Sequence, residues 1–266
     1  MRFGSLFAGI GGLDLGLERA GMECAWQVEL DEFCQKVLTK HWPDVPKYGD
    51  IHDVGRHNLE AVDLICGGFP CQPVSLAGRR QAQADPRWLW PEFARVVDEL
   101  RPRYVLVENV PGLYSAGGSK VLADLAAFGY DAEWDAIPAA ALGAPYKRFR
   151  IFLVAYVIGT QAHQQYGIFD GPSRFLGQPV GTRQEAARQT NGMPSNYDPT
   201  RLAKVFRWTH SNWWSEPNVG RLVCGVPARV DRLRALGNAV VPQVAEWVGR
   251  RILAAAQKEQ VGCVRE

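Results

Sequence analysis

Residues 2–21 read RFGSLFAGIGGLDLGLERAG, and this stretch decides the fold. Its apolar run at residues 2–7 predicts a strand, and the helical pattern of residues 13–20, closed by Gly21, predicts a helix. The glycines between the two permit a tight turn and let the backbone approach a ligand at the positively polarised end of a helix. The stretch therefore predicts a strand, a turn and a helix; whether the turn holds a ligand stays open at this point.

The same alternation continues along the chain. Further strands are predicted at residues 24–28, 64–66, 104–107, 133–138 and 150–156, and helices at residues 33–42, 91–100 and 120–128. Apolar strands separated by helices indicate an α/β fold with a doubly wound, mostly parallel sheet that is covered on both faces. In such sheets ligands bind beyond the carboxyl ends of the strands, so chemistry is expected in the loops that follow them.

The character of the sequence changes near residue 159. Residues 159–200 are polar with little periodicity, and tryptophans follow at positions 208, 213 and 214, either as a small core or as stacking surfaces. A helical apolar pattern returns from residue 232 and includes Val244, Trp247, Val248 and Ile252.

Composition and charge fit an ordinary globular protein. The 266 residues are 47% hydrophobic and 22% charged, with a net charge of +2. Residues 1–145 carry 13 Lys and Arg against 20 Asp and Glu (net −7), and residues 146–266 carry 17 against 8 (net +9). The basic second part is what a polyanion-binding region would show, although a solvated basic face would look the same.

Targeting and metal signals are not seen. The first residues do not form a signal peptide and no apolar run could span a bilayer, so we expect a cytoplasmic protein without a membrane partner. The six cysteines form no CxxC pair or His-Cys cluster, and we therefore expect no metal site.

Two carboxylates favour a nucleoside ligand near the glycine turn. Glu29 ends the second predicted strand, where it could accept hydrogen bonds from ribose hydroxyls, and Asp50 could accept one from an adenine amino group. Asp14 stands where the dinucleotide fingerprint has its last glycine, and it disfavours a pyrophosphate because two anions would repel. An adenosine-containing ligand is therefore expected.

A second set of residues has the character of a reactive site. Cys71 follows two glycines and lies between Pro70 and Pro73 in a stiff loop after a strand, which makes it a candidate nucleophile, with simple packing the alternative. Glu108 follows directly on the strand predicted at residues 104–107 and lies among apolar neighbours, which could raise its pKa and make it an acid. Strand alternation would place Arg148 and Arg150 on one face, able to reach one phosphate or base.

In this order the motifs resemble the DNA cytosine-5 methyltransferase family of the bacterial or phage type. The resemblance rests on five segments that follow the family's order and spacing: Phe7-Ala8-Gly9-Ile10-Gly11-Gly12, Pro70-Cys71-Gln72, Glu108-Asn109-Val110, Arg148-x-Arg150 and Gly237-Asn238-Ala239-Val240-Val241-Pro242. The family commonly has Gln where this chain has Tyr146.

The resemblance implies S-adenosylmethionine as methyl donor, with S-adenosylhomocysteine as product, and a Rossmann-like fold. It implies a catalytic and cofactor-binding domain at 1–157, a small irregular target-recognition region at 158–225, and a segment at 226–266 that returns to the first domain. The catalytic residues would be Cys71, Glu108, Asn109, Arg148 and Arg150. The donor site would be formed by Phe7, Ala8, Gly9, Gly11, Gly12, Leu13, Glu29, Leu30, Asp50, Ile51, Gly68, Pro70, Asn238 and Ala239.

The implied reaction explains these residue types. Addition of the Cys71 thiolate to C6 of cytosine makes C5 nucleophilic, Glu108 holds the N3 edge, and the two arginines steady the base and its phosphates. The cytosine would have to be flipped out of duplex DNA. A monomer is expected, and a companion restriction endonuclease is a possible partner.

Three alternatives remain at this level. The first is a transfer-RNA cytosine-5 methyltransferase with the same motifs, and the second is a catalytically silent DNA-binding regulator on the same fold. The third is a nicotinamide-dependent oxidoreductase, which Asp14 disfavours and which leaves Cys71 without a role.

Overall fold

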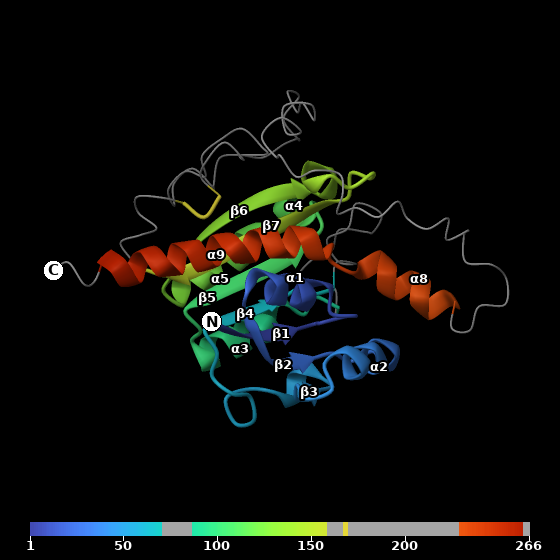
Figure 1. Cartoon of the computed structure of the whole chain (residues 1–266). Helices are drawn as coiled ribbons and strands as arrows, with labels where there is room; N and C mark the ends of the chain where they lie inside the picture. The colour runs from blue at the N-terminus through green and yellow to red at the C-terminus, as the bar shows by residue number, and fades with distance from the viewer. Residues whose placement is uncertain (71–86, 159–166, 170–228, 263–266) are drawn as a thin grey trace.

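The computed structural model describes residues 1–70, 87–158, 167–169 and 229–262 (Figure 1). Over those ranges a sheet of seven strands has the order β3-β2-β1-β4-β5-β7-β6. Its strands are β1 Arg2–Leu6, β2 Glu23–Val28, β3 Lys47–Tyr48, β4 Leu64–Gly67, β5 Tyr104–Asn109, β6 Tyr130–Pro138 and β7 Phe149–Val157. The helices are α1 Gly12–Ala20, α2 Glu32–His41, α3 Trp90–Leu100, α4 Leu113–Ala116, α5 Gly118–Ala127, α8 Arg229–Asn238 and α9 Pro242–Gly262, with 3-10 turns η1 Ile51–Asp53 and η3 Ala139–Leu142.

The predicted doubly wound, mostly parallel sheet is confirmed. Strands β1 to β5 pair in parallel, whereas β7 runs antiparallel between β5 and β6. Only the short η3 turn and a few further residues join β6 to β7, and a parallel crossover needs a dozen residues or more. The antiparallel pair at this edge therefore follows from the length of the connection.

The first strand–turn–helix unit forms as its sequence predicts. Gly11 precedes α1 and Gly21 ends it, both with positive φ (79° and 103°) that a side chain would disfavour. The next helix, α2, is capped at its N-terminus by Asp31, whose carboxylate accepts from the backbone N–H of Cys34 at 3.0 Å. Local chemistry thus sets the ends of both helices that flank β2.

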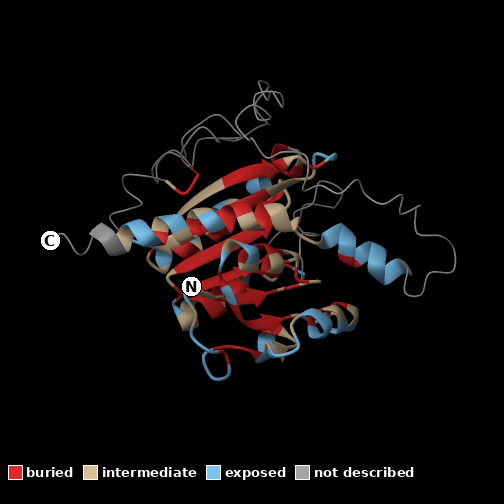
Figure 2. Cartoon of the chain, in the orientation of Figure 1, coloured by how far each residue is buried: buried red, intermediate tan, exposed pale blue. Residues whose placement is uncertain are grey.

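Each face of the sheet carries its own core, because alternate residues of a strand point to opposite sides. On one side, Ile65 and Val107 pack with residues of α3 and α5. On the other, Cys66 and Leu106 pack with residues of α1 and α9. In Figure 2 the buried residues fill the strands and the inner sides of these helices.

Helices α1 and α9 pack directly on each other although they come from the two ends of the chain (Figure 1). They approach closely through small residues: a Cβ added to Gly16 would lie 2.3 Å from the Cβ of Ala245. Three further residues of α9, namely Val244, Val248 and Ile252, are buried. The C-terminal helix therefore completes the layer that α1 begins.

Helix α8 differs from α9, from which Ala239, Val240 and Val241 separate it. Its apolar residues Val230 and Leu236 are exposed. Most of the predicted region 158–225 lies outside the described residues, so the three domain limits stay predictions. None of the helices in the described ranges is long and apolar enough to cross a membrane.

Candidate functional site

The turn between β1 and α1 is held open by backbone geometry. Phe7, Gly9 and Gly11 all have positive φ (54°, 58° and 79°), and the N–H of Gly11 donates to the carbonyl of Ala8 at 2.9 Å. A Cβ placed on Gly9 would meet no atom within 4 Å, so this side of the turn faces open space. The ring of Phe7 stacks on Phe93 with centroids 6.4 Å apart.

Glu29 joins this turn to the end of β2. Its carboxylate accepts from the backbone N–H of Gly9 at 2.7 Å and from that of Asp31 at 2.8 Å, through different oxygens. Each oxygen keeps a second lone pair, so the carboxylate can still accept from a ligand hydroxyl. The next residue, Leu30, is 68% exposed and offers an apolar surface beside the carboxylate.

Asp50 and Ile51 form the start of η1. The Oδ1 atom of Asp50 accepts from the backbone N–H of His52 at 3.0 Å and lies 2.6 Å from Nδ1 of that histidine. Hydrogen bonding to His52 lowers the pKa of the Asp50 carboxyl, which therefore stays ionised as an acceptor. Ile51 is buried, with 4% of its surface exposed.

The C-terminal segment meets both the glycine turn and Arg148. A Cβ on Gly12 would lie 2.4 Å from the carbonyl oxygen of Val240, so the turn requires glycine there. From the other side, Nη2 of Arg148 donates to the carbonyls of Gly237 (2.9 Å) and Ala239 (2.5 Å). The residues around Asn238 and Ala239 therefore lie between the turn and Arg148.

Glu108 is a buried carboxylate and the second-to-last residue of β5. The sequence predicts it just after the strand, so the strand is longer than predicted. Only 6% of the surface of Glu108 is exposed, and burial raises its pKa to about 7, against the opposing effect of Arg150 and Arg148. Nε of Arg150 lies 3.0 Å from Oε1 of Glu108. A Cβ on Gly68 would lie 2.7 Å from Oε2, so glycine leaves the room that this carboxylate occupies.

The two arginines do not share a strand face in the simple way that alternation predicts. Arg148 precedes β7 and has a φ of 34°, so the period of two does not extend to it. Its guanidinium turns to the C-terminal segment, while that of Arg150 turns to Glu108. Both charges still act on the Glu108 carboxyl, which lies within reach of each.

Asn109 contacts backbone. Its Nδ2 donates to the carbonyl of Phe69 at 3.1 Å, its Oδ1 accepts from the N–H of Val110 at 2.9 Å, and 2% of its surface is exposed. The amide thus ties the end of β5 to the segment Phe69–Pro70. Cys71 itself, at the start of residues 71–86, lies outside the described residues.

The repulsion argument against a pyrophosphate requires Asp14 to face the glycine turn. In the structure it does not. It is fully buried, and its carboxylate accepts from Ser5 Oγ at 3.1 Å and Gln27 Nε2 at 2.8 Å. Burial raises its pKa to about 6. Leu13, the neighbouring donor-site candidate, is also buried and packs in the core between α1 and α9.

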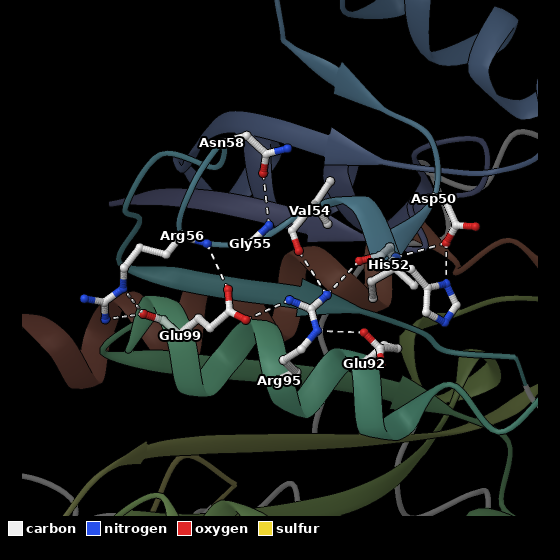
Figure 3. A network of polar contacts seen from close by, with 10 residues as sticks. Asp50, His52, Val54, Gly55, Arg56, Asn58, Glu92, Arg95 and Glu99 are labelled. Atoms are coloured by element: carbon white, nitrogen blue, oxygen red, sulfur yellow. Dashed lines mark hydrogen bonds and ion pairs between the residues drawn. The ribbon is translucent and has the colours of Figure 1, made fainter.

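Sequence reasoning missed a charged cluster beside η1. Arg95 of α3 donates to the carbonyls of Ile51 and Val54, both at 2.9 Å, and pairs with Glu92 and Glu99 (Figure 3). The available signal was the spacing of Glu92, Arg95 and Glu99, which places all three on one helix face.

Solved structures of known methyltransferases share the fold of this chain. The chain is similar in structure to a putative DNA modification methyltransferase encoded within a prophage of E. coli, at a TM-score of 0.51 and 29% identity over 59% of this chain and 47% of that one. The methyltransferase EhMeth of Entamoeba histolytica gives a TM-score of 0.59 over 96% of this chain and 98% of that one, and its 14% identity supports the fold alone.

The family follows from sequence. Residues 1–203 match the profile of the C-5 cytosine-specific DNA methylases. The chain is 34% identical over 161 residues to the Type II methyltransferase M.HhaI of Haemophilus parahaemolyticus, which is 59% of this chain and 49% of that protein. It is 35% identical over 177 residues to M.AquIA of a Picosynechococcus species, which is 58% of this chain and 71% of that protein. The chain belongs to the C-5 cytosine-specific DNA methylase family. It spans about half of the length of M.HhaI and of M.DsaV of Dactylococcopsis salina.

Proposed function

We propose that the chain transfers a methyl group from S-adenosylmethionine to C5 of a flipped-out cytosine in double-stranded DNA, through a covalent bond between Cys71 and C6. The observation that carries this proposal is the buried Glu108, whose raised pKa of about 7 and contact with Arg150 suit a group that protonates a base edge near neutral pH. Membership of the methylase family supports it.

The chemistry assigned to Cys71 and Glu108 balances with the methyl donor and solvent. The Cys71 thiolate adds to C6 while the protonated Glu108 donates to N3, which makes the ring an enamine that is nucleophilic at C5. When bound, S-adenosylmethionine would supply an electrophilic methyl group to that carbon and leave as S-adenosylhomocysteine. A solvent water or hydroxide then takes the C5 proton, the electrons of that C–H bond re-form the ring double bond and expel the Cys71 thiolate from C6, and N3 returns its proton to Glu108.

Arg150 and Arg148 hold charge close to the reacting base. Arg150 opposes the burial that raises the Glu108 pKa, so the carboxyl can both give and take back a proton near neutrality. Burial lowers the pKa of Arg148, whose contacts with Gly237 and Ala239 hold the arginine against the C-terminal segment. Their guanidinium groups would steady the base and its neighbouring phosphates.

The residues near the glycine turn fit an adenosine-containing donor. Open space lies beside Gly9, Glu29 keeps acceptor capacity for ribose hydroxyls, and the exposed Leu30 offers an apolar surface for the adenine. Asp50 would accept from the adenine amino group. Phe7, Ala8, Gly11, Gly12, Ile51, Gly68, Pro70, Asn238 and Ala239 would line the rest of the site, and Leu13 would support it from the core.

We assign Asn109 a positioning role in this reaction. Its amide hydrogen bonds are made to the backbone of Phe69 and Val110, so it would hold the segment that leads to Cys71.

The proposal extends to setting and partners. We expect a cytoplasmic monomer that acts on duplex DNA, with residues 158–225 contributing target recognition through their positive charge. A companion restriction endonuclease would fit the Type II names of the relatives.

The test uses labelled S-adenosylmethionine with duplex DNA and with transfer RNA in parallel. We expect label in DNA alone, and bisulfite sequencing of DNA from expressing cells should locate the cytosine. Cys71→Ser should abolish transfer and keep donor binding, whereas Cys34→Ser, in the buried face of α2, should keep both. Undiminished transfer by Cys71→Ser would overturn the mechanism, and label in transfer RNA alone would overturn the substrate.

A further inference from the structure

Arg95 clamps the turn that carries Asp50 and Ile51. Its Nη2 donates to two backbone carbonyls at once, those of Ile51 and Val54, each at 2.9 Å (Figure 3). These carbonyls come from a segment 41 to 44 residues earlier in the chain than Arg95. The contact therefore joins α3 to η1 across the fold.

The guanidinium is itself held in orientation. Nε of Arg95 donates to Glu92 at 2.7 Å and Nη1 donates to Glu99 at 2.8 Å, one helical turn to either side. Because the guanidinium is planar, fixing these two positions directs Nη2 at the turn. Glu92 and Glu99 thus fix the orientation of the Arg95 guanidinium.

The segment after η1 lies directly on α3 as well. A Cβ on Gly55 would lie 2.2 Å from Oε2 of Glu99, and that oxygen accepts from the backbone N–H of Arg56 at 3.0 Å. The Arg56 side chain donates back to the carbonyl of Glu99, with Nε at 2.7 Å. A side chain at position 55 would force the Glu99 carboxylate to move away from this segment.

Two backbone hydrogen bonds belong to the turn itself, and the first runs from the N–H of Asp53 to the carbonyl of Asp50 at 3.1 Å. The closing hydrogen bond of η1, from the N–H of Val54 to the carbonyl of Ile51, measures 3.4 Å. Asp50 contributes a cap to His52 at 3.0 Å. The two charge-assisted hydrogen bonds from Arg95 are shorter than the closing bond and stronger in kind.

We infer that Arg95 is a positioning residue for the adenine end of the methyl donor. By fixing the carbonyls of Ile51 and Val54, it sets the Asp50 carboxylate at the distance from which it accepts from the adenine amino group. The inference rests on the proposed function, because Asp50 faces an adenine only if the chain binds S-adenosylmethionine.

Arg95→Lys is the informative variant, since an ammonium keeps the charge and loses the fork. Arg101→Lys is its control: Arg101 lies at the end of the same helix, and its Nη1 donates to the carbonyl of Phe128 at 2.9 Å, away from η1. Glu92→Gln keeps Arg95 and removes the negative charge of one of the two groups that orient it, so it serves if Arg95→Lys fails to fold. Circular dichroism establishes which variants are folded.

The first measurement needs no ligand. Hydrogen exchange of the backbone amides of Asp53 and Val54 should be about tenfold faster in Arg95→Lys than in the wild type, and unchanged in Arg101→Lys. Equal exchange in all three proteins would overturn the clamp.

The second measurement is calorimetric binding of S-adenosylhomocysteine and of its deaminated analogue S-inosylhomocysteine, which lacks the amino group. The wild type should prefer the adenosyl compound. Arg95→Lys should bind it about tenfold more weakly and lose most of that preference, with kcat at saturating donor nearly unchanged. Glu92→Gln should show a smaller change in the same direction.

The two proposals fail differently. A wild type that binds the adenosyl compound, beside an Arg95→Lys variant with equal affinity and preference, overturns the positioning role alone. A wild type that binds neither compound overturns the proposed function and the inference with it.

Discussion

Arg150 and Glu108 meet across two antiparallel strands, with Nε of the arginine 3.0 Å from Oε1 of the carboxylate. Direct register pairs Glu108 with Phe152, so Arg150 reaches Glu108 diagonally from a position two residues before Phe152 on β7. Oε1 accepts no well-directed hydrogen bond from any residue in the described ranges. Burial consequently outweighs the arginine, and the carboxyl is about half protonated near neutral pH.

Glu108 should make the fold less stable as pH rises. Its pKa is about 7 in the folded chain against an ordinary 4.5, so its contribution is fully present below 4.5 and lost as pH rises through 7. Between pH 6 and 8 the loss should be about 1 kcal/mol. Glu108→Gln should lack it, as urea unfolding at three pH values will measure. If the free energy of unfolding changes equally with pH in the variant and the wild type, this prediction is wrong.

Arg150→Gln should raise the Glu108 pKa further, because it removes the larger of the two opposing charges. The protonated form then persists to higher pH, and the alkaline limb of kcat/KM for DNA should move upward while its maximum falls. Arg148→Gln, which removes the smaller effect, should give a smaller displacement. Identical pH profiles for the three proteins would show that the protonation of Glu108 does not control kcat/KM.

Gly16→Ala should destabilise the fold by about 1–3 kcal/mol, the usual cost of overpacking. The new Cβ would lie 2.3 Å from Ala245 and 2.4 Å from the carbonyl oxygen of Pro242, which outweighs the gain in helix propensity. Gly237→Ala is the matched control, since its Cβ would meet nothing within 4 Å. Chemical denaturation of both variants checks the difference, and equal stabilities would show that α9 can shift away.

Asn109→Asp should lower kcat about tenfold or more and leave donor binding intact. The change replaces an N–H that donates to the Phe69 carbonyl at 3.1 Å by an oxygen that repels it. Single-turnover methylation, with calorimetry of the donor, measures the two effects separately. A loss of donor affinity with kcat unchanged would contradict the role of Asn109 in holding the segment that leads to Cys71.

Much of the parallel half could be predicted from local chemistry. The run at residues 2–7, the glycines and Gly21 specify β1, the turn and α1, and the structure ends the helix where the sequence predicts. The strand at residues 104–107 is extended by Glu108 and Asn109, which apolar patterning alone would exclude. The two-residue β3 is too short to leave a pattern.

The rest depends on contacts that spacing does not encode. The positive φ of Arg148 interrupts the alternation that the sequence suggests, and nothing in the residues nearby signals it. The clamp by Arg95 joins segments more than 40 residues apart through backbone carbonyls. Every residue has such a carbonyl, so the residue types do not reveal the contact. The antiparallel direction of β6 and β7 could have been predicted, because their connection is short.

The packing of α9 on α1 constrains the order in which this chain can fold during synthesis. The surface of α1 around Gly16 and Leu17 is made early on the ribosome, yet its cover arrives only when residues 242–262 have emerged. Contacts so distant in sequence form late and leave apolar surface open to other molecules meanwhile. We therefore expect a nascent chain halted before α9 to bind chaperones through this surface, and the emergence of residues 242–262 to reduce that binding.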